Sequence, residues 1–155
     1  MIGTDQFVWY ASMTIVHGVI GALLVHLLTP YRPAYGVLFG MLPDADRVLQ
    51  VLGGVGMIDH RGITHTLAFL GALVLVLVVA GAPDGLTHSA IIGVGSHLLL
   101  DSASGGGVRW LWPLVETKTL VPLHLNARGK VEVLVLVAVV LLVLAPHKRR
   151  YTRIN

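Results

Sequence analysis

The sequence contains no cysteine, so disulfide bonds and thiolate metal sites are excluded. Charged residues are also scarce: they make up 12% of the 155 residues, against about 25% in soluble domains. Hydrophobic residues make up 55%, and the mean hydropathy is +0.79. A chain with so few charges cannot cover a globular surface with polar groups. We therefore predict a single-domain integral protein of the cell membrane (inner or plasma membrane), formed by residues 1–155.

Several signatures are absent, and each absence excludes a class of protein. There is no H-E-x-x-H motif, which many zinc proteases carry, and no G-x-S-x-G motif, which many serine hydrolases carry. No basic run is interleaved with aromatic residues, so the formal charge of +3 indicates lipid phosphates and not nucleic acid as the anionic partner. The first residues carry no cationic segment, so we expect the first apolar run to be a retained span and not a signal peptide.

The apolar runs predict an all-α, polytopic membrane helical bundle. Four segments are expected to cross the bilayer, at residues 7–28, 65–82, 86–102 and 131–145. A shorter apolar stretch at 33–42 predicts a short or interfacial helix between prolines, and the sequence APDG at 82–85 predicts a tight turn. Thr64 is expected to cap the helix that follows it.

Histidines and aspartates lie within or beside these spans, where ionisable groups are costly and by default indicate a functional site. His97 and Asp101 are four residues apart and therefore share one helix face. A hairpin of the second and third spans would bring Asp101 to the membrane face that carries His65. The candidate ligands of a divalent metal ion are His17, Asp44, Asp46, His60, His65, His97 and Asp101.

Asp44 and Asp46 are two residues apart, so in an extended turn they would point to opposite sides. One of them is then expected to bind a metal ion, and the other to orient a histidine or bridge a second ion. Without cysteine the donors suit zinc, with manganese or iron as alternatives. A single histidine in a span often only hydrogen bonds to a neighbouring helix, and we prefer that interpretation for His26 and His88.

A histidine in the first span, followed by LPDAD (42–46), HRGITHT (60–66), SHLLLD (96–101) and LWP (111–113), resembles the membrane-bound metal-dependent hydrolase family of the YdjM type. That family is distantly similar to zinc-dependent phospholipase C and the S1/P1 nucleases, which are helical enzymes with a zinc cluster. The resemblance implies a phospholipase C-like metal-site core in which Asp101 bridges two metals. The ligands that it implies are His17, Asp44, His60 or His65, His97 and Asp101.

The chain departs from the soluble phospholipases after Asp101. Those enzymes have a further histidine and an H-x-x-x-E motif that complete a third metal site. Here Glu116 and His124 follow at a different spacing. One or two divalent ions are therefore expected, and not three.

The resemblance, together with these ligands, implies a metal-dependent hydrolase of the phosphoesterase type, acting on a phospholipid or lipid-linked phosphate through a metal-activated water. Arg61, together with Arg47, would take the charge that develops on the phosphate oxygens. The member of the Asp44 and Asp46 pair that does not bind metal would be the general base.

Two other functions stay open from the sequence. A non-catalytic metal carrier or sensor would place ligands along a path through the bundle, so that His26 and His88 matter as well. A structural or partner-binding membrane protein would tolerate replacement of its histidines. For the hydrolase, Trp110 and Trp112 beside Pro113 favour a lipid phosphate as the substrate, because tryptophan suits headgroup depth, where such a phosphate lies.

Overall fold

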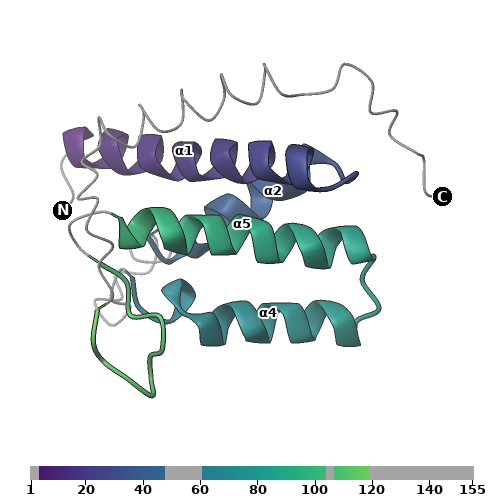
Figure 1. The fold of residues 1–155 in the computed structure, drawn as a ribbon. Helices are drawn as coiled ribbons and strands as arrows, with labels where there is room; N and C mark the ends of the chain where they lie inside the picture. The colour runs from purple at the N-terminus through teal and green to yellow at the C-terminus, as the bar shows by residue number, and fades with distance from the viewer. Residues whose placement is uncertain (1–3, 48–60, 104–106, 119–155) are drawn as a thin grey trace.

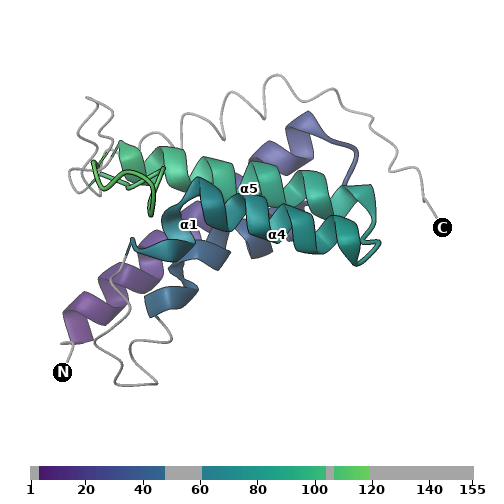
Figure 2. The same ribbon diagram turned by 90° about the horizontal axis from the view of Figure 1, so that it is seen from below.

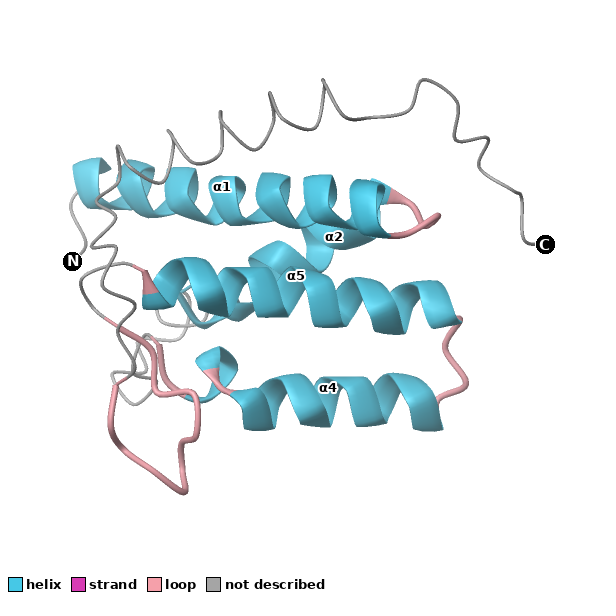
Figure 3. Cartoon of the chain, in the orientation of Figure 1, coloured by secondary structure: helices cyan, strands magenta, loops and turns pink. Residues whose placement is uncertain are grey.

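Helices form the part of the chain that the structure, a computed structural model, describes: residues 4–47, 61–103 and 107–118. No β-strand occurs within these ranges, which confirms the all-α prediction for them (Figure 3). The fourth predicted span, 131–145, lies outside them. The elements are α1 (Thr4–Leu28), α2 (Pro33–Met41), the 3₁₀ helices η1 (Leu42–Asp44) and η2 (Ile63–His65), α4 (Leu67–Val79) and α5 (Asp84–Ser102).

The helix α5 lies in the middle of the bundle, with α1 on one side and α4 on the other (Figure 1). The helices α4 and α5 form the predicted hairpin, joined through residues 80–83. The short α2 packs against both α1 and α5, and α1 crosses the hairpin at an angle when the bundle is seen from below (Figure 2). The C-terminal end of α5 and the N-terminal end of α4 therefore meet at one end of the bundle.

Proline and threonine set the ends of these helices. Pro30 follows α1 closely, and Pro33 occupies the first turn of α2, where its missing amide costs no hydrogen bond. Thr66 caps α4, because its hydroxyl accepts a hydrogen bond from the Phe69 amide at 3.0 Å. The prediction that Thr64 is the cap is wrong, since its hydroxyl contacts Asp46 and His65 instead.

The described bundle exposes many apolar side chains and buries a cluster of polar ones beside its hydrophobic core. On α4 no side chain is buried, and Val79 is 78% exposed. The buried set includes three histidines and three aspartates. Such an exterior is unfavourable in water but matches lipid, where polar groups must be satisfied within the protein.

One described helix is long and apolar enough to cross a membrane, through the 21 residues Val8–Leu28 of α1. The helix α4 is apolar but has 13 residues, fewer than the roughly 20 of a full span. The helix α5 is long enough but carries more polar residues. The structure therefore shows one apolar helix long enough to span a membrane, and the arrangement with four spans stays a prediction.

Glycines allow α1, α2 and α5 to approach closely. Gly36 and Gly40 are four residues apart on α2, the spacing that lets membrane helices pack backbone to backbone. A side chain on Gly36 would collide with the carbonyl oxygen of Gly21, and a Cβ on Gly40 would lie 2.6 Å from the carbonyl oxygen of His17. This packing holds the end of α2 beside both α1 and α5.

Replacing Gly36 by alanine is therefore expected to force α1 and α2 apart, with a loss of about 1–3 kcal/mol in the free energy of unfolding. Thermal unfolding in detergent measures this. Gly71 on α4 is the matched control, since no heavy atom lies within 4 Å of the Cβ that would be added there. Equal unfolding temperatures for Gly36→Ala and Gly71→Ala would contradict the packing argument.

Candidate metal centre

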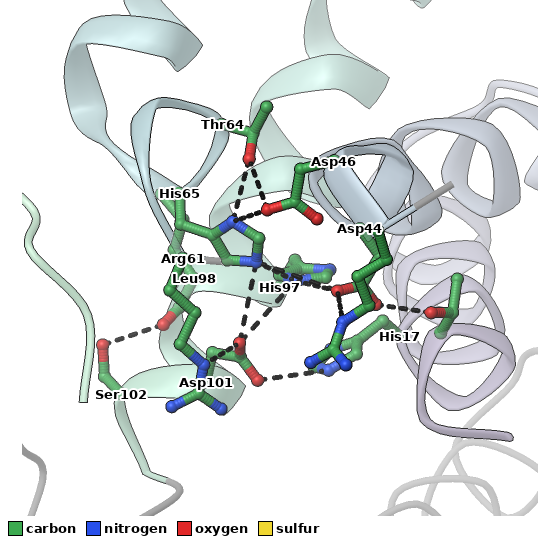
Figure 4. A network of polar contacts seen from close by, with 12 residues as sticks. His17, Asp44, Asp46, Arg61, Thr64, His65, His97, Leu98, Asp101 and Ser102 are labelled. Carbon is green, nitrogen blue, oxygen red and sulfur yellow. Dashed lines mark hydrogen bonds and ion pairs between the residues drawn. The ribbon is translucent and has the colours of Figure 1, made fainter. Parts of the chain in front are cut away.

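Three histidines and three aspartates lie buried together at the end of the bundle where α4 begins and α5 ends (Figure 4). They come from α1, η1 and the helical residues 45–47 after it, η2 and α5. Each side chain belongs to a residue that is at most 6% exposed. They are His17, Asp44, Asp46, His65, His97 and Asp101.

Two carboxylate oxygens each lie close to both of two imidazole nitrogens. The Nε2 atoms of His65 and His97 are 3.1 Å apart. Asp44 Oδ1 lies 3.8 Å from each of these nitrogens. Asp101 Oδ2 lies 3.7 Å from His65 Nε2 and 4.0 Å from His97 Nε2. Tetrahedral zinc with ligand distances of about 2.0–2.2 Å separates its ligands by about 3.3–3.6 Å, so each oxygen with the two nitrogens is close to the spacing that one ion needs.

The hydrogen bond of His97 to Gly40 decides which imidazole nitrogen can bind metal. His97 Nδ1 lies 2.8 Å from the carbonyl oxygen of Gly40, which can only accept, so Nδ1 carries the proton and donates. His97 Nε2 is left with its lone pair directed at His65 Nε2. Two such lone pairs facing each other repel unless a cation or proton lies between them, which makes the donor set fit a divalent ion.

Asp46 and Thr64 contact the Nδ1 side of the His65 ring, away from His97. Thr64 Oγ1 lies 3.0 Å from His65 Nδ1 and donates to Asp46 Oδ2 at 3.3 Å. Asp46 Oδ2 is itself 3.6 Å from His65 Nδ1. A proton on Nδ1 is therefore satisfied on this side, and Nε2 faces the centre, as metal-binding histidines commonly require.

The two aspartates of LPDAD thus lie in different places. Asp44 faces the centre, and Asp46 lies on the far side of His65. The extended turn expected from their spacing is wrong, because Asp44 ends the 3₁₀ helix η1 and Ala45 continues in helical backbone geometry. The carboxylates are separated by the intervening imidazole and not by an extended chain.

Side chains of α1 contact the second carboxylate oxygen of Asp44 and of Asp101. Thr14 Oγ1 donates to Asp44 Oδ2 at 2.6 Å, and His17 Nε2 lies 3.4 Å from Asp101 Oδ1. The His17 ring also stacks on His97, with ring centroids 3.9 Å apart. Sequence reasoning missed Thr14; its position three residues before His17, on the same face of an apolar helix, was the available signal.

Two groups of residues could each hold an ion: Asp44 with His65 and His97, and His17 with His97 and Asp101. His97 belongs to both, but its Nδ1 is bonded to Gly40, so it offers only Nε2. One nitrogen cannot serve two ions at once. Among the described residues, these two groups therefore cannot both bind an ion through His97 at the same time.

Two arginines border the centre on its more exposed side. Arg47 Nε lies 3.5 Å from Asp44 Oδ1, and Arg61 Nε lies 3.0 Å from Asp101 Oδ2. Their side chains are 20% and 21% exposed, whereas the two carboxylates are nearly buried. The Arg47 guanidinium also lies over the Tyr10 ring, 3.8 Å from its centroid.

The segment after α5 is fixed against the same end of the bundle. Trp110 Nε1 donates to Ser102 Oγ at 2.6 Å, and the Trp110 carbonyl accepts from the Leu67 amide at 2.9 Å. Leu111 and Leu114 beyond it are 52% and 88% exposed. An apolar turn therefore projects next to the centre.

The other predicted histidines do not join the centre in the described structure. His60 lies outside the described residues. His26 and His88 are exposed, and His88 stacks on Tyr31 towards the opposite end of α5. Its Nδ1 lies 2.7 Å from the carbonyl oxygen of Asp84.

Residues 13–154 match the model of a family described as YdjM inner membrane protein. The chain belongs to the YdjM inner membrane protein family. It is similar to the inner membrane protein YbcI of Escherichia coli strain K12, with 38% identity over 98 residues. The alignment covers 56% of this chain and 56% of YbcI, so it spans about half the length of that relative. No solved structure is significantly similar.

Membership of the YdjM family and the apolar helix α1 together place this protein in the inner membrane, as predicted from its composition. The predicted family is also confirmed. For this member of the YdjM family, the buried His and Asp residues form groups that could hold a metal ion. The identity of each ligand stays a prediction for experiment.

Replacing His65 or His97 by glutamine is expected to abolish retention of a divalent ion by the purified YdjM-family protein, because each removes one of the two facing nitrogens. Metal content after dialysis, measured by elemental analysis, checks this. His88→Gln is the matched control, since that histidine is exposed on the same helix as His97. Equal metal content in all three variants and in the wild type would exclude this centre.

Asp46→Asn tests separately whether Asp46 positions the His65 ring for metal binding. It is expected to weaken metal affinity about 10–100-fold without changing the number of ions bound, since the amide cannot fix the tautomer as a carboxylate does. Competition with a chelator of known affinity measures the change. An unaltered dissociation constant would show that Asp46 does not act through His65.

Proposed function

We propose that this protein is a membrane-embedded, metal-dependent hydrolase that cleaves a phosphoester in a phospholipid or lipid-linked phosphate. The observation that carries the proposal is the proximity of two buried imidazole nitrogens to the carboxylate oxygens of Asp44 and Asp101, with an arginine beside each carboxylate. A structural role would not require donors of this kind to be buried so close together.

His65, His97, Asp44 and Asp101 would hold the divalent ion, for which zinc is the simplest choice and manganese or iron are alternatives. A bound divalent ion supplies Lewis-acid chemistry, because it lowers the pKa of a water molecule and withdraws charge from a phosphoryl oxygen. His17 either extends this set through Asp101 to a second ion or fixes Asp101 in place.

The surrounding residues have separate roles in this proposal. Asp44 faces the centre through Oδ1, so it is the member of the LPDAD pair that would bind the ion. Asp46 is a positioning residue, because it reaches the centre only through His65. Arg47 and Arg61 lie towards solvent and would bind the phosphate oxygens, where charge develops during hydrolysis.

A lipid substrate is supported by where the centre lies. The exterior of α1 and α4 is apolar, and the centre lies at the end of the α4–α5 hairpin, where α4 begins and α5 ends. The exposed Leu111 and Leu114 project beside it, next to the anchored Trp110. An apolar turn beside a cationic rim suits the boundary between headgroups and acyl chains.

The four-span topology and the phospholipase C-like core belong to the same proposal. The hairpin of α4 and α5 and the delivery of His and Asp from several helices support it. Residues 131–145 would supply the further span.

The test is hydrolysis by the zinc-loaded protein in vesicles made from bacterial inner-membrane phospholipids, with phosphorus NMR to detect the released headgroup or phosphate. Asp101→Asn is expected to lower the rate at least about 100-fold, and a chelator should do the same. Asp84→Asn, at the exposed start of α5, is the control. Metal binding by the wild type with no product from any lipid would favour the carrier or sensor instead.

A further inference from the structure

Asp44 divides its two oxygens between different partners. Its Oδ2 accepts the hydrogen bond from Thr14 on α1. Its Oδ1 faces both imidazole Nε2 atoms at 3.8 Å and also lies 3.5 Å from Arg47 Nε. The oxygen that is placed to bind an ion is therefore the same oxygen that pairs with arginine.

Asp101 repeats this arrangement on the other side of the centre (Figure 4). Its Oδ1 faces His17 on α1. Its Oδ2 faces both imidazoles, at 3.7 and 4.0 Å, and lies 3.0 Å from Arg61 Nε. In both carboxylates, α1 holds one oxygen, while the other is shared between the centre and an arginine.

A carboxylate oxygen that gives its charge to a divalent ion attracts a guanidinium less strongly. The three aspartates of the centre outnumber the two arginines by one, so together these groups carry a small net negative charge. A bound divalent ion makes this net charge positive. Repulsion between ion and guanidinium then favours turning the arginines outward, and both side chains are already partly exposed.

We propose that Arg47 and Arg61 are exchangeable counter-cations. They neutralise Asp44 and Asp101 when no divalent ion is bound, and they bind phosphate once the ion has taken over those carboxylates. The identity of the anion rests on the proposed function. The guanidinium suits this exchange, because its planar fork matches carboxylate and phosphate oxygens equally well. Metal and phosphate then bind cooperatively, and by linkage each raises the affinity of the other by the same factor.

The first arm of the test measures zinc affinity by chelator competition, without phosphate. Arg61→Gln leaves Asp101 without its counter-cation, so zinc should bind at least about fivefold more tightly than in the wild type. Arg61→Lys keeps the charge and should stay near the wild type. Arg47→Gln provides a second variant, because Arg61 also donates to the Gly107 carbonyl and its loss could disturb folding. Unchanged or weaker zinc binding in both glutamine variants would overturn the proposal.

The second arm measures binding of inorganic phosphate with and without zinc. The wild type should bind phosphate at least about fivefold more tightly when zinc is present. The double variant Arg47→Gln/Arg61→Gln should lose most of this gain, whereas the control Arg32→Gln, at the start of α2, should keep it. Phosphate binding by the zinc-loaded double variant that equals the wild type would show direct metal ligation without the arginines, and would overturn the proposal.

The two proposals fail in different ways. Zinc and phosphate coupling without hydrolysis of any lipid would contradict the proposed function and leave the exchange of counter-cations intact. Hydrolysis without an effect of the arginine variants on zinc or phosphate binding would contradict the exchange alone.

Discussion

The hydrogen bond from His97 Nδ1 to the carbonyl oxygen of Gly40 is the contact on which the centre depends. It fixes the tautomer of a buried imidazole and so directs a lone pair at His65. It depends on the close approach of α2 to α5, where a Cβ added to Gly93 would lie 2.8 Å from the Gly40 amide nitrogen. The carbonyl also lies near the end of α2, where backbone acceptors lack the full set of intrahelical partners. Gly40 therefore contributes both to the packing of the helices and to the orientation of a metal-site histidine.

Burying three carboxylates is expensive, and the structure offsets the cost with several partial partners instead of one strong salt bridge. Thr14, Thr64 and the two arginines each take up part of the charge. Removing one partner from such a cluster leaves a buried charge uncompensated. That instability is also what makes the cluster attractive to a divalent ion, because an ion satisfies all of the facing oxygens at once.

Much of this arrangement could be predicted from the sequence. The hairpin followed from the apolar runs on either side of APDG, and it correctly brought His65 to Asp101. The shared face of His97 and Asp101 followed from helical spacing alone. The separate positions of Asp44 and Asp46 were anticipated, but for a wrong reason, because the turn between them is helical and not extended.

Other parts could not be predicted, since they depend on contacts between distant segments. Thr14 is unremarkable in an apolar helix until η1 brings Asp44 against it. The role of Gly40 requires knowledge of which helices cross and how closely. Tyr10 lies under Arg47 only because α1 passes beneath the end of η1. None of these contacts has a signature in residue spacing.

The interior beyond the centre bears on the choice between enzyme and carrier. A carrier needs a polar path that leaves the site in two directions. Among the described residues, the core on the far side of His17 and His97 includes Val25, Ala90 and Val94, all fully buried. His26 and His88, which would extend such a path, lie on the outside. The arginines, by contrast, are partly exposed beside the centre. Among the described residues, polar groups therefore continue from the centre towards Arg47 and Arg61 and not into the apolar core, which suits the proposed hydrolase better than a carrier.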